Sequence, residues 1–242
     1  MIARSLLGAG LAAHLVPSVA AIAPLRRAVL PGLCGESGRA HVALTFDDGP
    51  DPESTPEFLD TLAALGVHAT FFVLGTQLAA HPELGRRTVD EGHELAVHGW
   101  SHRPLLLRGP RATAVDLRRA RDLVAEVGGS PPRHWRPSHG IPTGAGLLAA
   151  RRLGMRAVLW TADGHDWRAD ASGDSVAGRI VPRLEPGAVV LLHDSDVTSA
   201  PGAWRSALDA LPQLIDACAQ RQLSVGPLCE HWLREPVAAA AV

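Results

Sequence analysis

The chain has 242 residues, of which 46% are hydrophobic and 20% charged, and its formal net charge is -2. This length suits one α/β barrel domain, which runs to roughly 200–250 residues, and the composition is typical of a globular protein with a full core. A disordered chain is thereby excluded. The near-neutral balance, without a sustained run of Lys and Arg, also excludes the electrostatic signature of a nucleic-acid binder. We expect an uncharged polymer or a small molecule as partner, and no obligate protein partner is implied.

The three cysteines are Cys34, Cys218 and Cys229. They are scattered, and no CxxC pair occurs, so they predict neither a disulfide framework nor a thiolate metal site. We expect free thiols that are buried.

The first 37 residues differ from the rest. Arg4 precedes an uncharged stretch from Ser5 to Ile22, and residues 21–23 have the small-x-small form of a secretory cleavage site. Three interpretations stay open: a signal, a membrane anchor, or a helix packed on the barrel. The first two favour a secreted or membrane-associated protein over a cytoplasmic one. We predict that residues 1–37 are this segment with its linker, outside the catalytic unit, and that 38–242 form the catalytic domain.

From His41 onward, short β-branched or aromatic runs alternate with helical segments. Regular alternation implies parallel strands with right-handed crossovers, and seven strands predict a distorted (β/α)7-type barrel. Ser54 with Glu57 three residues later predicts a capping box, and Pro110 suits a first helical turn. The expected strands are residues 41–46, 70–74, 94–98, 134–136, 156–161, 188–193 and 223–225.

Polar residues follow the predicted strands, at the ends where barrels of this kind build their active sites. They predict one face that gathers carboxylates, imidazoles and an arginine. In chain order these residues are Asp47, Asp48, His98, His102, Arg136, Asp163, Asp166, His193 and Asp194.

Two of these groups point to a metal site. Asp47 and Asp48 leave a buried strand together, so one can bind a cation while the other stays free as a base; an ordinary Asp-Gly-Pro turn explains them equally well when they are taken alone. His98 and His102 are four residues apart, a spacing that places both imidazoles on one face of a helical turn and suits a divalent metal. Together they favour a site of two histidines and one carboxylate, with positions open for water and substrate.

These motifs, in this order and spacing, resemble those of the polysaccharide deacetylases (the NodB-homology domain, carbohydrate esterase family 4). The resemblance covers Val42 to about Val225. It is carried by TFDDGP at 45–50, the His98/His102 pair, Arg136-Pro137-x-x-Gly140, Asp166-Trp167 and Leu191-Leu192-His193-Asp194.

The resemblance implies a role for each matching residue. Asp48, His98 and His102 would be the metal ligands, and Asp47 the base that takes a proton from the attacking water. Arg136 would hold this base, because an arginine binds a carboxylate with two bonds and stays charged. His193 would be the general acid, oriented by Asp166. Trp167 and Leu191 would line the pocket for the acetyl methyl group.

The implied activity is a metal-dependent hydrolase that removes acetyl groups from N-acetylated sugars of a chitin-like or peptidoglycan polysaccharide, and so cleaves a carbon–nitrogen bond that is not a peptide bond. One divalent ion is expected, with zinc favoured by the imidazole-rich ligand set and cobalt or manganese as alternatives. The competing functions are an O-acetyl esterase and a carbohydrate-binding protein with a relic site. A non-haem iron oxygenase also uses two histidines and a carboxylate, but commonly on an all-β scaffold.

The sequence departs from the family pattern at two places. Gly99 stands where Ser or Thr usually follows the first histidine, and Ser138-His139 replace a small residue or Pro and a Tyr. We place His139 in the substrate pocket. His165 could reach it as well, and either histidine could instead compete for the metal. These departures bear on substrate preference more than on catalysis, because a backbone N–H that binds the oxyanion survives a change of side chain.

Overall fold

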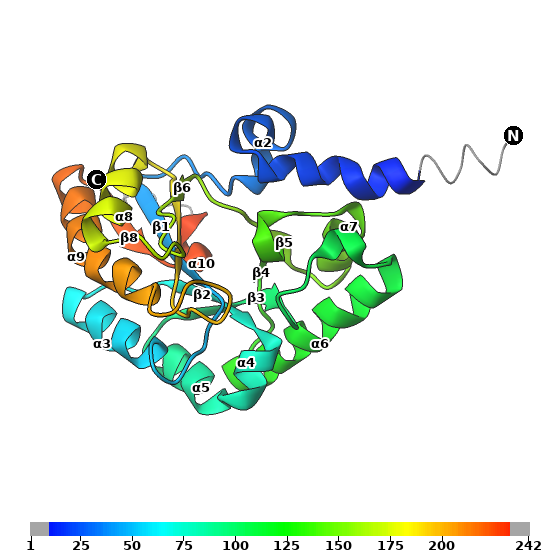
Figure 1. Ribbon diagram of the computed structural model, residues 1–242, viewed down its shortest axis with the longest axis horizontal. Coiled ribbons are helices and arrows are strands. Elements are labelled where there is room, and N and C mark those ends of the chain that lie inside the picture. The colour runs from blue at the N-terminus through cyan, green and yellow to red at the C-terminus, as the bar shows by residue number, and fades with distance from the viewer. Residues whose placement is uncertain (1–9, 233–242) are drawn as a thin grey trace, which may run out of the picture.

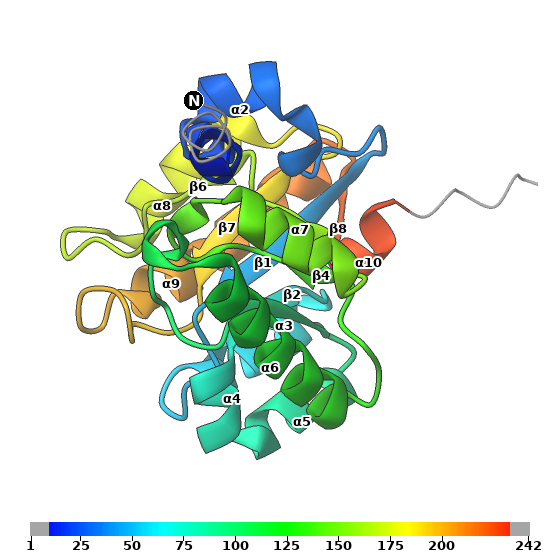
Figure 2. The same cartoon turned by 90° about the vertical axis from the view of Figure 1, so that its right-hand side faces the viewer.

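The computed structural model describes residues 10–232 (Figures 1 and 2). Its strands form one parallel sheet in the order β5-β4-β3-β2-β1-β7-β6, and β8 pairs with β1. The strands are β1 (His41–Asp47), β2 (Thr70–Leu74), β3 (Glu94–Gly99), β4 (His134–Trp135), β5 (Arg156–Ala157), β6 (Ala162–Asp163), β7 (Val189–His193) and β8 (Ser224–Gly226).

Helices surround this curled sheet in Figure 1, so the predicted parallel distorted barrel is confirmed. Before β1 lie η1 (Val16–Ala21), α2 (Ala23–Val29) and η2 (Pro31–Leu33). The others are α3 (Thr55–Leu65), α4 (Gly75–Ala80), α5 (Pro82–Asp90), η3 (Leu105–Leu107), α6 (Pro110–Gly128), η4 (Ser138–Gly140), α7 (Gly144–Arg152), α8 (Gly173–Ile180), η5 (Val181–Arg183), α9 (Trp204–Gln220) and α10 (Leu228–His231).

The central strand β1 separates two packed layers. Side chains alternate along a strand, so Val42, Leu44 and Phe46 pack in the main core that includes α3 and α9, while Ala43 belongs to a smaller cluster inside the barrel. Asp47 continues the inward register of Ala43. The alternation therefore places a carboxylate inside the barrel, at the end of a strand that is buried at every residue.

One predicted strand, 156–161, is wrong beyond its first two residues. Only β5 lies within it and pairs with β4, whereas β6 follows it and pairs with β7 at the other end of the sheet. Val158 N still donates to Trp135 O on β4, but Thr161 N donates to Val189 O on β7. The chain thus crosses from one edge of the sheet to the other within four residues, and residues 158–161 close the barrel without forming a strand.

The helix starts were predicted with mixed success. Pro110 begins α6, as expected. The capping box at Ser54 is wrong: Ser54 precedes α3, but its hydroxyl donates to the carbonyl oxygen of Asp194 at 2.6 Å instead of capping the helix. A contact 140 residues away in the sequence therefore outweighs the local signal.

In Figures 1 and 2 the N-terminal helices lie along the side of the barrel that carries β6 and α7. No helix in residues 10–232 is long and apolar enough to cross a membrane. The division at residue 37 remains a prediction. Cys34 and Cys218 are buried free thiols, as expected, whereas Cys229 is partly exposed.

Candidate active site

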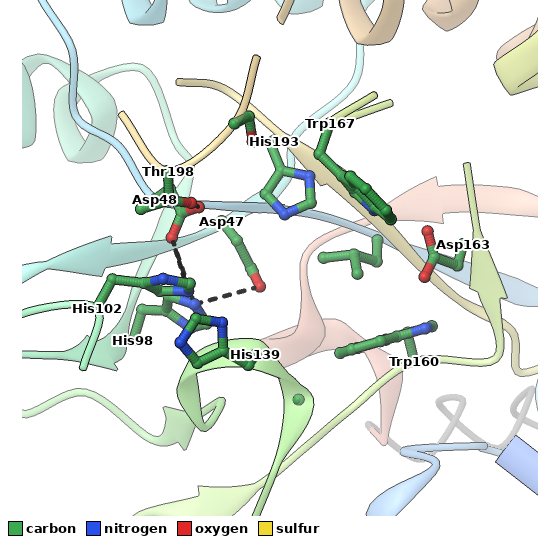
Figure 3. Close-up of a pocket in the computed structure, with 13 residues that line it drawn as sticks. Asp47, Asp48, His98, His102, His139, Trp160, Asp163, Trp167, His193 and Thr198 are labelled. Atoms are coloured by element: carbon green, nitrogen blue, oxygen red, sulfur yellow. Dashed lines mark hydrogen bonds and ion pairs between the residues drawn. The ribbon is translucent and has the colours of Figure 1, made fainter. Parts of the chain in front are cut away.

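A cavity of about 360 Å³ opens at the carboxyl ends of the strands (Figure 3). It brings together most of the residues that the sequence singled out. Its lining is Asp47, Asp48, His98, His102, His139, Gly140, Trp160, Asp163, Trp167, Leu191, His193, Thr198 and Ser199.

Asp48, His98 and His102 form the one cluster of potential metal ligands found in residues 10–232, with ligand atoms that all lie within 4.8 Å of one another. Asp48 Oδ1 is 3.4 Å from His98 Nε2 and 3.6 Å from His102 Nε2. This oxygen is buried without a hydrogen-bond partner, while Oδ2 accepts a bond from the Thr198 hydroxyl. A buried carboxylate oxygen without a donor is costly, so the donor set fits a cation.

The two histidines converge by a route that the sequence did not predict. His98 is the last residue but one of β3 and His102 follows in a loop, so the expected single helical turn is wrong. Gly99, between them, has a φ of 116°, which L side chains rarely adopt. His98 Nδ1 lies 3.0 Å from the carbonyl oxygen of Arg136, and Ser138 Oγ donates to His98 O. These bonds fix the ring with Nε2 toward Asp48.

Asp47 is held by a buried arginine behind the pocket wall. Arg136 Nη1 donates to Asp47 Oδ1 at 2.6 Å and to Thr45 Oγ1 at 2.9 Å. Its other nitrogens donate to the carbonyl oxygens of Val158 and Leu159. Burial raises the pKa of Asp47 above its ordinary value, and the guanidinium charge opposes this shift only in part. A fixed carboxylate with a raised pKa can accept a proton.

His193 is paired with a second buried carboxylate outside the pocket lining. Its Nδ1 lies 3.0 Å from Asp166 Oδ1, and its backbone N–H donates to Asp166 Oδ2 at 2.7 Å. Burial lowers the pKa of His193, but the charge and hydrogen bond of Asp166, with the charges of Asp48 and Asp47, outweigh it and raise the pKa to about 10. The imidazole is therefore protonated at neutral pH. Its Nδ1 is occupied by Asp166, so its Nε2 is the nitrogen available to a ligand in the pocket. Figure 3 places Asp47 between this ring and the histidine cluster.

The three predicted pocket residues line the cavity: Trp167, Leu191 and His139. The His139 ring centroid lies 4.1 Å from that of His102, and the His139 backbone has a φ of 60°. Burial lowers the pKa of His139, so it stays neutral beside the cluster. His165 does not reach the lining; its ring lies beside Trp167, with centroids 5.8 Å apart.

A family model described as "Polysaccharide deacetylase" matches residues 35–158, just over half of the chain. The chain belongs to the polysaccharide deacetylase family. This confirms the resemblance drawn from the motifs and the prediction of a deacetylase fold and enzyme class. The matched residues contain both aspartates, both histidines of the cluster and Arg136.

This family member is similar to a chitooligosaccharide deacetylase of Bradyrhizobium sp. (strain ANU 289), with 41% identity over 79% of this chain and 90% of that protein. Among solved structures, the Bc1960 peptidoglycan N-acetylglucosamine deacetylase superposes with a TM-score of 0.75, at 30% identity over 81% of this chain and 90% of the other. The family 4 carbohydrate esterase from Streptomyces lividans gives 0.70, at 31% identity over 78% and 93%.

Several residues that line the pocket of this family member carried no signal that the sequence analysis used. Trp160 lies within residues 156–161, which the sequence predicts to be a strand, and Thr198 and Ser199 lie in the loop after β7. The sequence predicts Asp163 at a strand end and indicates no role for it. The 194–203 loop is rich in small polar residues directly after His193, and that composition was the available signal.

Proposed function

We propose that this domain hydrolyses the acetamide of an N-acetylated sugar in a chitin-like or peptidoglycan glycan, releasing acetate and a free amine. One observation carries the proposal: a three-ligand cluster, a held carboxylate and a charged imidazole share one pocket. The names of the relatives support the substrate class, because they include enzymes that act on chitooligosaccharide and on peptidoglycan N-acetylglucosamine.

Asp48, His98 and His102 would hold one divalent cation. The imidazole-rich set favours zinc, with cobalt or manganese as alternatives. Such an ion, when bound, supplies Lewis-acid polarisation and lowers the pKa of water to about 7. Three protein ligands leave room for water and substrate, as in catalytic sites.

In this proposal Asp47 takes a proton from the water whose oxygen attacks the acetyl carbonyl carbon. Arg136 fixes the carboxylate in place, because its fork also binds the barrel backbone. The backbone N–H of His139 would donate a hydrogen bond to the oxyanion that forms. The N–H groups of Gly140 and Ile141 already donate to the carbonyl oxygens of Pro137 and Ser138.

His193 would donate its proton to the departing nitrogen as the carbon–nitrogen bond breaks. Amines leave poorly unless they are protonated, and the paired Asp166 keeps the imidazole charged until then. Trp167 and Leu191 would enclose the acetyl methyl group, with His139 at the edge of the same pocket.

Acetate release from N-acetylated oligosaccharides tests this proposal. Activity should vanish when a chelator removes the metal and return with zinc. His98→Ala should lose the ion, whereas Asp47→Asn and His193→Ala should keep it and each lose roughly 10²–10⁴-fold in rate, the contribution of one positioned proton transfer. Metal loss on replacing Asp47 or His193 would contradict the division between ligands and proton-transfer groups.

The O-acetyl esterase alternative is separated by paired substrates. Mass spectrometry of products from matched N-acetyl and O-acetyl sugars should show loss from the N-acetyl sugar. His193→Ala should also lose less rate on an activated ester than on an N-acetyl sugar, because the leaving group of such an ester needs little protonation. Equal losses on both substrates would remove the general acid from the proposal.

A further inference from the structure

The segment 158–161, which crosses between β5 and β6, supports the base of the proposed mechanism. Arg136 donates to the carbonyl oxygens of Val158 at 3.3 Å and Leu159 at 2.9 Å, and the same guanidinium holds Asp47. The position of Arg136 therefore depends on where this short segment lies. The segment is not fixed by a regular strand, because β5 ends before it and β6 begins after it.

The N-terminal segment also binds residues 158–161, through backbone groups other than those that bind Arg136. Arg26 Nη2, on α2, donates to the carbonyl oxygen of Trp160 at 2.7 Å. Leu159 N donates to Leu33 O, also at 2.7 Å. Successive carbonyl groups of the crossing are thus bound by two arginines, one behind the active site and one from a segment that precedes the barrel.

The Trp160 ring lies close to the same two guanidinium groups. Its centroid is 5.3 Å from the Arg26 carbon and 5.8 Å from that of Arg136, both within the range of cation–π attraction. Gly140 packs so closely on the ring that a Cβ there would come within 2.3 Å of it. Trp160 and Gly140 both line the cavity, which Figure 3 shows for the Trp160 ring. Moving Arg26 would therefore disturb a wall of the active site.

The contribution of Arg26 to folding stability does not by itself explain an arginine at this position. Its side chain is buried, with 3% of the residue exposed, and within residues 10–232 it forms no ion pair with a carboxylate. Besides Trp160 O it binds Ala20 O at 3.2 Å, and its Nε lacks a partner. A buried charge without a carboxylate partner is costly to desolvate, and an apolar side chain of similar length often stabilises such a site equally well or better.

We propose that Arg26 is a positioning residue of the active site, which holds Trp160 and the 158–160 segment so that Arg136 and Asp47 keep their places. The proposal rests on the proposed acetamide hydrolysis for its kinetic readout. It places residues 26–34 within the catalytic unit, in contrast to the division at residue 37 expected from the sequence.

The test compares Arg26→Met, Arg26→Lys and Arg27→Ala in the full chain loaded with zinc. Arg26→Met keeps the length of the side chain but loses the donors, so kcat should fall about tenfold, since small misplacements of a catalytic group are costly, with KM changed less than about twofold. Arg26→Lys should restore most of kcat, because an ammonium can donate to Trp160 O. Arg27 is the matched control: it is exposed and pairs with exposed Glu36, so its variant should match the wild type.

Three further measurements separate positioning from general damage. The zinc stoichiometry of Arg26→Met should match the wild type, because the metal cluster lies on other elements. Its urea unfolding midpoint should also match, because an apolar side chain of similar length replaces a buried charge without an ion pair. Acrylamide quenching of Trp160, isolated by difference from Trp160→Phe variants, should increase in Arg26→Met. The proposal would be overturned if kcat and quenching in Arg26→Met equalled those of the wild type. It would also be overturned if kcat fell only in proportion to a loss of folded protein or of zinc. An inactive wild type would instead overturn the proposed function, and the quenching result would still decide the positioning role.

Discussion

Thr198 forms a hydrogen bond with one carboxylate oxygen of Asp48, and the other oxygen lies next to the two histidines of the cluster. Its hydroxyl donates to Oδ2, whereas Oδ1 faces His98 and His102 without a partner. Groups that form hydrogen bonds with a metal-ligating side chain set its orientation, and their replacement usually weakens metal binding. The division of the two oxygens indicates that the carboxylate is oriented before any ion is bound.

Thr198→Val should therefore weaken zinc binding by about 10–100-fold, the usual cost of removing a supporting hydrogen bond. Competition with a chromophoric chelator measures the affinity directly. Thr198→Ser keeps the hydroxyl and should bind zinc like the wild type, and Ser199→Ala is the neighbouring control on the pocket lining. Unchanged affinity in Thr198→Val would show that Asp48 is oriented by its backbone alone.

At the scale of elements, the strand ends were predictable and the crossings were not. Buried apolar runs with polar residues at their carboxyl ends placed Asp47, His98 and His193 on one face, because parallel strands share a direction. Arg26, Trp160 and Thr198 escaped prediction since their partners lie 134 and 150 residues away. No local periodicity reports such contacts.

The loop after β3 gives an element-scale test. Gly99 has a φ of 116°, a conformation that side chains disfavour, and a Cβ there would meet Asp116 Oδ2 at an acceptable 3.4 Å. Gly99→Ser, which restores a hydroxyl typical of the family, should thus destabilise the fold by about 1–3 kcal/mol through backbone strain.

Urea unfolding of the metal-free protein measures this cost. Gly178→Ala is the matched control, because Gly178 lies within α8 with open space around its Cα, and there alanine should be neutral or stabilising. A Gly99→Ser protein as stable as the wild type would mean that the loop relaxes to another conformation.

Across the whole molecule, His193 differs from the buried histidines at the amino ends of the strands in its charge at neutral pH. At the carboxyl ends, His193 is paired with Asp166 and stays charged at neutral pH. At the amino ends, His41 and His93 lie beside the starts of β1 and β3, and His231 lies on α10 with its Nδ1 2.8 Å from that of His41. Burial lowers the pKa of each of these three to about 4.

These three neutral histidines should each contribute a loss of stability in acid. Below about pH 6.5 each of these histidines binds a proton in the unfolded chain, but in the folded chain it does so only near pH 4. The stability that these three residues contribute therefore falls as the pH drops through this window. Urea midpoints of chelator-treated wild type and of a histidine variant at pH 7.5 and 5 isolate this contribution by difference. His93 Nδ1 accepts the N–H of Ala69 at 3.1 Å, a bond that an asparagine oxygen can replace. His93→Asn should therefore lose less stability between the two pH values than the wild type does, and an equal loss would assign the acid sensitivity to other groups.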